Sequence, residues 1–136
     1  MLTFYGYDRC STCRNAKKWL DAHGHRYRFV DITRQPPPKP LLQRIAHSDA
    51  YSLRSLFNTA GQRYRELDLK TRLPHMSESD ALDLLATYGK LVKRPLVVEG
   101  DASGGSGGAG ASGGSGGERF TVGFKPEVYE QVWGRP

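Results

Sequence analysis

The chain has 136 residues, of which 25% are charged and 38% hydrophobic, with a formal net charge of +6. This length suits one domain with one core. No apolar run approaches the roughly 18 residues of a membrane-spanning helix, so we expect no contact with a membrane. Basic residues alternate with acidic ones and form no stripe, which argues against direct nucleic-acid binding. The first residues lack the features of a signal peptide, so we expect a cytoplasmic protein.

The first quarter of the chain predicts a βαβ unit. Residues 2–5 are apolar and aromatic, as in a buried strand, and residues 27–32 alternate well enough for a second strand. Between them, residues 11–23 have helical spacing, and Gly24 can end the helix with a positive φ. The residues expected on the buried face of this helix are Cys13, Ala16, Trp19, Leu20 and His23.

Residues 35–90 predict a helical lobe inserted into this α/β pattern. The proline-rich segment 35–40 breaks regular structure, and Pro40 can begin a helix. Ser52 and Ser77 are suitable N-caps for later helices, and Gly89 follows the last of them. Because these helices are apolar on one side only, the lobe should pack against the rest of the chain.

The last part of the chain predicts two strands and a helix. A strand over residues 96–98 follows Pro95, a fourth strand covers 120–124, and Pro126 begins a helix. The sequence therefore indicates one domain over 1–136, with its core in 1–34 and 91–136. The final helix should face the core with Val128, Tyr129, Val132 and Trp133.

A glycine- and serine-rich tract at 101–117 separates these last two strands. Nine of its 17 residues are glycine and none is large and apolar, so we expect a flexible coil within the last hairpin. A natural low-complexity insertion and an engineered linker both fit this composition. Neither origin would give the tract a part in catalysis.

The two cysteines of the chain, Cys10 and Cys13, are spaced C-x-x-C at the start of the first predicted helix. Unpaired N–H groups and the helix dipole favour an anion there, so the pKa of a cysteine thiol should fall below its free value of about 8.5. A redox or nucleophilic cysteine is the first interpretation, and a buried, inert cysteine is the alternative. Zinc binding with His23 and His25 is a further alternative, but the spacing C-x2-C-x9-H-x-H differs from zinc fingers, and we expect no metal.

The order β-(CxxC)-α-β, helical lobe, Arg94-Pro95, β-β-α resembles the ArsC/Spx family. This family includes glutaredoxin-coupled arsenate reductases and the Spx/MgsR redox regulators. The resemblance implies a thioredoxin-like α/β fold with a four-stranded mixed sheet and an inserted helical lobe. It covers nearly the whole chain outside 101–117.

The resemblance also implies roles for individual residues. Cys10 matches the family's nucleophile, Arg94 an arginine that binds the oxyanion, and Pro95 a cis-proline. Cys13 stands where single-cysteine arsenate reductases have serine, and we expect it to resolve an adduct on Cys10, although it could merely pack against the first strand. Two further oxyanion arginines of those reductases map near Asn58 and Lys125, so that set is incomplete here. The residues expected to contact substrate are Ser11, Thr12, Arg14, Asn58, Pro95 and Lys125.

Two functions follow from the sequence. The leading hypothesis is an arsenate reductase-like thiol oxidoreductase, which holds no bound cofactor and uses glutathione/glutaredoxin or thioredoxin as reductant. Its substrate would be an oxyanion or a disulfide, and we expect a monomer. The alternative is a redox-sensing regulator of the Spx/MgsR type, which binds RNA polymerase and is switched by a Cys10–Cys13 disulfide.

Overall fold

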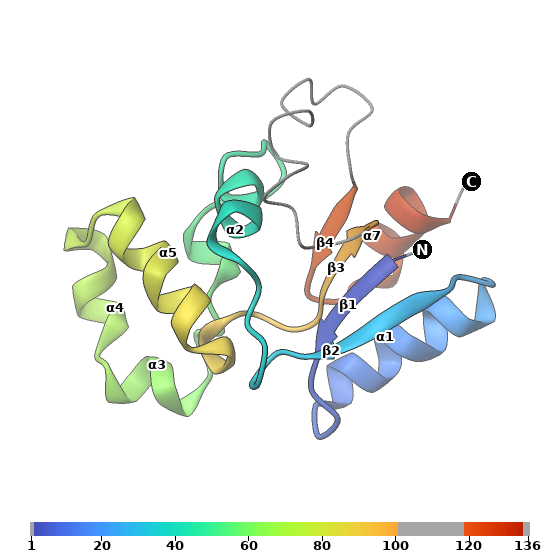
Figure 1. The fold of residues 1–136 in the computed structure, drawn as a ribbon, viewed down its shortest axis with the longest axis horizontal. Helices are drawn as coiled ribbons and strands as arrows, with labels where there is room; N and C mark the ends of the chain where they lie inside the picture. Colours follow the sequence, from blue (N-terminus) through green and yellow to red (C-terminus); the bar gives the residue numbers. More distant parts are fainter. Residues whose placement is uncertain (1, 101–118, 135–136) are drawn as a thin grey trace.

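A four-stranded mixed sheet forms the centre of the fold, as predicted (Figure 1). In this computed structural model, residues 2–100 and 119–134 are described. The tract at 101–117 lies outside the described residues, so its predicted behaviour stays a prediction. Within the described residues, no helix is both long and apolar enough to cross a membrane.

The strands lie in the order β2-β1-β3-β4. Strand β1 pairs in parallel with β2 and antiparallel with β3, which in turn pairs antiparallel with β4. The parallel pair requires the crossover that α1 supplies, and the antiparallel pairs bring the start of β3 and the end of β4 together. The bounds are Leu2–Gly6 for β1, Tyr27–Asp31 for β2, Leu96–Glu99 for β3 and Phe120–Val122 for β4.

Helices cover both faces of the sheet (Figure 1). Helices α1 (Ser11–Ala22) and α7 (Pro126–Trp133) pack on one face, and the lobe packs on the other. The lobe contains α2 (Lys39–Ala46), α3 (Gln62–Glu66), α4 (Leu69–Arg72) and α5 (Glu78–Thr87). Three short 3-10 helices complete the lobe: Arg54–Leu56, Leu73–His75 and Gly89–Leu91.

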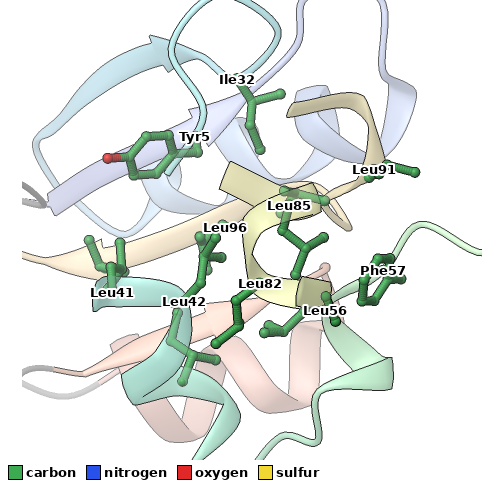
Figure 2. Packing of buried hydrophobic residues seen from close by; sticks show 14 of the residues in the cluster. Tyr5, Ile32, Leu41, Leu42, Leu56, Phe57, Leu82, Leu85, Leu91 and Leu96 are labelled. Atoms are coloured by element: carbon green, nitrogen blue, oxygen red, sulfur yellow. The ribbon is translucent and has the colours of Figure 1, made fainter. Parts of the chain in front are cut away.

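Alternation along the strands divides the core in two. Leu2, Phe4 and Val97 join the cluster under α1 and α7, whereas Tyr5 and Leu96 join the cluster under the lobe. Figure 2 shows this second cluster, in which leucines of α2 and α5 meet the sheet. Period-two alternation is what a sheet covered on both faces requires of its strands.

Several predicted helix ends are confirmed. Gly24 has a φ of +77° just after α1, and Pro126 opens α7. The Ser77 hydroxyl accepts a hydrogen bond of 3.1 Å from the N–H of Asp80 at the start of α5. These positions depend on neighbouring residues alone, which is why the sequence identifies them.

Two expectations need correction. On α1, Cys13, Ala16 and Leu20 are buried, but Trp19 is only half-buried and His23 is exposed, with its ring stacked on Trp19 at 3.7 Å. The helix is therefore buried along a narrower stripe than its spacing suggested. The fourth strand ends at Val122 and not at 124, because Gly123 takes a φ of +79° that leaves the extended region.

Two close contacts join the lobe to the sheet. A Cβ on Gly89 would lie 1.7 Å from the carbonyl oxygen of Ile32, so only glycine allows this approach. An isolated antiparallel bridge pairs Phe57 with Val92. In this bridge the Asn58 N–H donates to the Leu91 carbonyl at 2.7 Å, and the Lys93 N–H donates to the Leu56 carbonyl at 2.8 Å.

Candidate functional site

Cys10 occupies the N-cap position of α1. Its Sγ accepts a hydrogen bond of 3.3 Å from the N–H of Cys13. The Cys10 N–H donates to the Tyr7 carbonyl at 3.1 Å, which closes the turn after β1. The sulfur thus lies where the first turn of the helix presents unpaired N–H groups, and the residue is half-buried.

The pKa of Cys10 is lowered from its ordinary value. Burial alone would raise the pKa, but hydrogen bonds from the Cys13 side chain and backbone and the positive charge of Arg94 outweigh it. A lowered pKa increases the fraction of thiolate, which is the nucleophilic form. The prediction of an anion-favouring position at Cys10 therefore has a physical basis in the structure.

The pKa of Cys13 is shifted in the opposite direction. It is fully buried, and burial together with the hydrogen bond to Cys10 raises its pKa to about 12. It packs with Phe4 and Val97 in the cluster under α1 and α7, and a Cβ on Gly6 would lie 3.3 Å from its sulfur. Cys13 is thus a protonated donor at neutral pH, and both cysteines are free thiols in this structure.

Arg94 and Pro95 lie opposite Cys10 at the start of β3. The peptide bond between them is cis, as the resemblance implied. Pro95 is buried, whereas Arg94 is half-buried, with its guanidinium carbon 5.8 Å from the centre of the Tyr7 ring. Because the charge of Arg94 acts on both cysteine sulfurs, Arg94 differs from an ordinary surface arginine at a strand entry.

A cavity of about 260 Å³ lies in front of Cys10. It gathers five of the nine residues that the sequence proposed for the site: Cys10, Thr12, Asn58, Arg94 and Lys125. The bridge between Phe57 and Val92 brings Asn58 there, from a segment distant in sequence. The space greatly exceeds that of one water, about 30 Å³, so a small oxyanion or the sulfur end of a larger ligand fits.

Other proposed residues lie outside the lining of this cavity. Ser11 is exposed on the first turn of α1, and the Arg14 guanidinium donates to the carbonyl of Asp8 at 3.1 Å. Cys13 and Pro95 are buried and do not line the cavity. The spacing of residues along α1 does not reveal which side chains turn toward the sulfur.

Sequence reasoning missed Lys93 and the shape of the turn after β4. Lys93 lines the cavity next to Arg94, and a Cβ on Gly123 would lie 3.1 Å from Cε of Lys93. The N–H of Gly123 donates to the Pro95 carbonyl at 2.9 Å, so this glycine ties the end of β4 to the cis-proline. The run Lys93-Arg94-Pro95 signalled the region, but not the direction of the lysine.

The two histidines considered as zinc ligands have other contacts. The His23 Nδ1 lies 2.8 Å from the Trp19 carbonyl, and the His25 Nε2 lies 2.6 Å from the Trp133 carbonyl. Both follow the C-terminal end of α1, about 18 Å of helix away from Cys10. The part of the chain that the structure describes holds no group of three or more metal-ligating side chains.

A cysteine at the start of the first helix, facing a cis-proline at a strand entry, defines a thioredoxin-like fold with a thiol site. Comparison with protein families agrees, since the model of the ArsC family matches residues 5–132. The chain belongs to the ArsC family.

The chain is similar to an uncharacterized protein, to a regulatory protein and to a solved structure that is described as a possible arsenate reductase. The uncharacterized protein YusI of Bacillus subtilis (strain 168) is 43% identical over 132 residues, which cover 97% of this chain and 98% of YusI. The regulatory protein MgsR of the same strain is 31% identical over 98 residues, or 72% of this chain and 76% of MgsR. Among solved structures, a possible arsenate reductase from Streptococcus mutans UA159 is 36% identical with a TM-score of 0.75, covering 96% of this chain and 98% of that chain.

Proposed function

We propose that the protein is an arsenate reductase-like thiol oxidoreductase in which Cys10 is the nucleophile. The observation that carries this proposal is the contrast between the two thiols. The pKa of Cys10 is lowered in an open cavity, whereas burial and the hydrogen bond to Cys10 raise the pKa of Cys13 to about 12. Cys10 is thus the thiol suited to attack a substrate, and Cys13 is a buried, protonated thiol one helical turn further along α1.

The first step is the attack of the Cys10 thiolate on an oxidised substrate. With a disulfide, a new bond forms to one substrate sulfur, the substrate S–S bond breaks, and the other sulfur leaves as a thiolate. With arsenate, the thiolate forms a bond from sulfur to As(V), one As–O bond breaks, and that oxygen leaves as hydroxide, which takes up a proton from solvent to become water. Arg94, with Lys125 and Asn58 in the same cavity, would stabilise the negative charge of either substrate.

The second step uses Cys13. Its thiol loses its proton as its sulfur attacks the sulfur of Cys10, and the bond from Cys10 to the substrate breaks. The substrate leaves with two electrons, as a thiolate or as arsenite, and a Cys10–Cys13 disulfide remains. Two thiols, from glutathione with glutaredoxin or from thioredoxin, would reduce this disulfide and be oxidised to a disulfide themselves, which suits a cytoplasmic, monomeric enzyme without a bound cofactor.

The test is arsenate-dependent consumption of NADPH with each reductant system. We expect turnover in at least one system, loss of turnover in Cys10→Ser, and a mixed adduct that accumulates on Cys10 in Cys13→Ser. A disulfide substrate assayed in parallel distinguishes the two substrate classes. Absence of turnover with both substrate classes, in protein whose Cys10 still alkylates as a thiolate, would refute the proposal.

A second candidate is a redox-sensing regulator that binds RNA polymerase. The similarity to MgsR, a regulatory protein, and the presence of Cys13 favour it. A Cys10–Cys13 disulfide would then be the switch rather than a catalytic intermediate. Capture of polymerase subunits that depends on reductant would support this function, and equal absence of capture in oxidised and reduced protein would exclude it.

A further inference from the structure

A second cavity of about 460 Å³ lies along β4, next to the cavity in front of Cys10. The two cavities share four lining residues: Lys93, Val122, Gly123 and Lys125. We call the two neighbouring cavities together the β4 trough. Because Cys10 lines the smaller cavity, a ligand that spans both cavities would place one end at the reactive thiol.

The second cavity is much larger than a tetrahedral oxyanion requires and has an apolar floor. Phe120 and Val122 of β4 and Val128 and Val132 of α7 line it with half-buried side chains. The N–H of Val122 donates to the Tyr51 hydroxyl at 3.1 Å, so that backbone donor on the edge of β4 is already used. A ligand there would thus be held by side chains and not by strand pairing at Val122.

The charged side chains that line the β4 trough are all positive. Lys93, Arg94 and Lys125 line the two cavities, and the described residues contribute no acidic side chain to either. Lys93 and Lys125 are exposed, and neither forms an ion pair with another described residue. Unpaired cations above an apolar floor favour a ligand with carboxylates and apolar side chains.

We propose that the β4 trough binds an extended acidic and partly apolar peptide segment that flanks the cysteine of a disulfide substrate. This inference rests on the proposed oxidoreductase function and narrows its substrate to peptide disulfides. The peptide lies along β4 with its sulfur at Cys10. The Cys10 thiolate then forms a bond to that sulfur, and the other half of the disulfide leaves as a thiolate that takes up a proton.

Two eight-residue peptides test this inference in a Cys13→Ser background, where the adduct on Cys10 is not resolved by Cys13. Each carries one cysteine in a mixed disulfide with 2-mercaptoethanol and two leucines, and they differ only in two glutamates that become glutamines. Mass spectrometry gives the rate of adduct formation. At low ionic strength we expect the acidic peptide to react about fivefold faster, which is the scale of exposed charge pairs, and salt should reduce this ratio.

Substitution of lysines tests whether the preference for the acidic peptide arises in the β4 trough. Lys93→Gln together with Lys125→Gln should bring the ratio of the two rates close to one. Lys70→Gln, which removes an exposed lysine of α4 outside both cavities, should leave the ratio unchanged. Equal rates in the parent protein, or a ratio that the double substitution does not change, would overturn the inference.

A binding measurement separates the inference from the function on which it rests. The same peptides, labelled with a fluorophore and with serine in place of cysteine, cannot react but can still bind. If the acidic peptide binds preferentially, and Lys93 and Lys125 are needed for this, the β4 trough is a peptide-binding site even where no adduct forms. Absence of the adduct would then refute only the oxidoreductase function. Adduct formation without any preference for the acidic peptide would refute peptide binding by the β4 trough and support the oxidoreductase function.

Discussion

Replacing Arg94 with glutamine should slow the reaction of Cys10 with iodoacetamide at pH 7. Burial raises the pKa of Cys10, and hydrogen bonds from Cys13 and the charge of Arg94 lower it by more than that. A cysteine of ordinary pKa, about 8.5, is only about 3% thiolate at pH 7. A Cys10 that lost every lowering influence would be subject to burial alone, so its thiolate fraction at pH 7 would fall to about 3% or less and its alkylation would slow in proportion.

Arg94→Gln removes the charge and the guanidinium hydrogen bond of Arg94 but not the hydrogen bonds from Cys13, so the loss of rate should fall short of that of a variant that lacks all of these influences. The hydrogen bonds from Cys13 remain, including the bond of 3.3 Å from its N–H. Cys13→Ala removes the side-chain donor and keeps the backbone donor, so it should also cause a partial loss. The two losses should combine in the double variant, although contact between the groups can make them non-additive.

The assay is the alkylation rate of Cys10 as a function of pH, with each cysteine resolved by mass spectrometry. Arg94→Gln should move the midpoint of the profile to higher pH and leave the alkaline plateau nearly unchanged. Lys70→Gln removes the same charge from an exposed position of α4 and should leave the midpoint where it was. An unchanged midpoint in Arg94→Gln, or an equal shift in Lys70→Gln, would refute the role assigned to Arg94.

Three further predictions concern the rest of the chain. Gly89→Ala should lower the free energy of unfolding in urea by about 3 kcal/mol or more, because its Cβ would meet the Ile32 carbonyl at 1.7 Å. Gly24→Ala, whose Cβ would meet open space, should lower it by only about 1–2 kcal/mol, from its positive φ. Similar losses in the two variants would contradict the close contact at Gly89. As the pH rises from 8.5 toward 12, the free energy of unfolding should fall, since unfolded Cys13 ionises while burial and the hydrogen bond to Cys10 raise the pKa of the folded thiol to about 12. Urea midpoints across this range should fall less steeply in Cys13→Ala, and parallel curves would contradict that sign. Shortening 101–117 to a tight turn should leave the alkylation rate of Cys10 unchanged, because β3 carries the chain about 13 Å from the site before that tract begins; a large fall in rate would disprove it.

Local features of the fold could be predicted from the sequence. The N-cap at Ser77, the positive φ of Gly24 and the start of α7 at Pro126 depend on a few adjacent residues. The position of Cys10 at the start of α1 is of the same kind. The βαβ pattern of the first quarter also predicts the parallel pairing of β1 with β2, whereas the pairing of β1 with β3 in a four-stranded sheet was inferred from the resemblance to a family.

The site depends on contacts between distant segments, and there the sequence is less informative. Asn58 reaches the cavity only because the bridge at Phe57 holds its segment beside Val92. Lys93 lines the cavity beside Gly123, whereas Arg14 turns to the carbonyl of Asp8. Helical and strand periodicity describe one element at a time, so they do not determine which side chains of different elements converge.

The bridge between Phe57 and Val92 also gives the site a reporter that needs no chemical label. Its two amide protons, on Asn58 and Lys93, belong to residues that line the cavity in front of Cys10. Both protons exchange with solvent only when the junction between lobe and sheet opens. A ligand that contacts Asn58 and Lys93 together resists this opening, so deuterium uptake at these two amides measures occupancy of the site for substrates that leave no covalent trace.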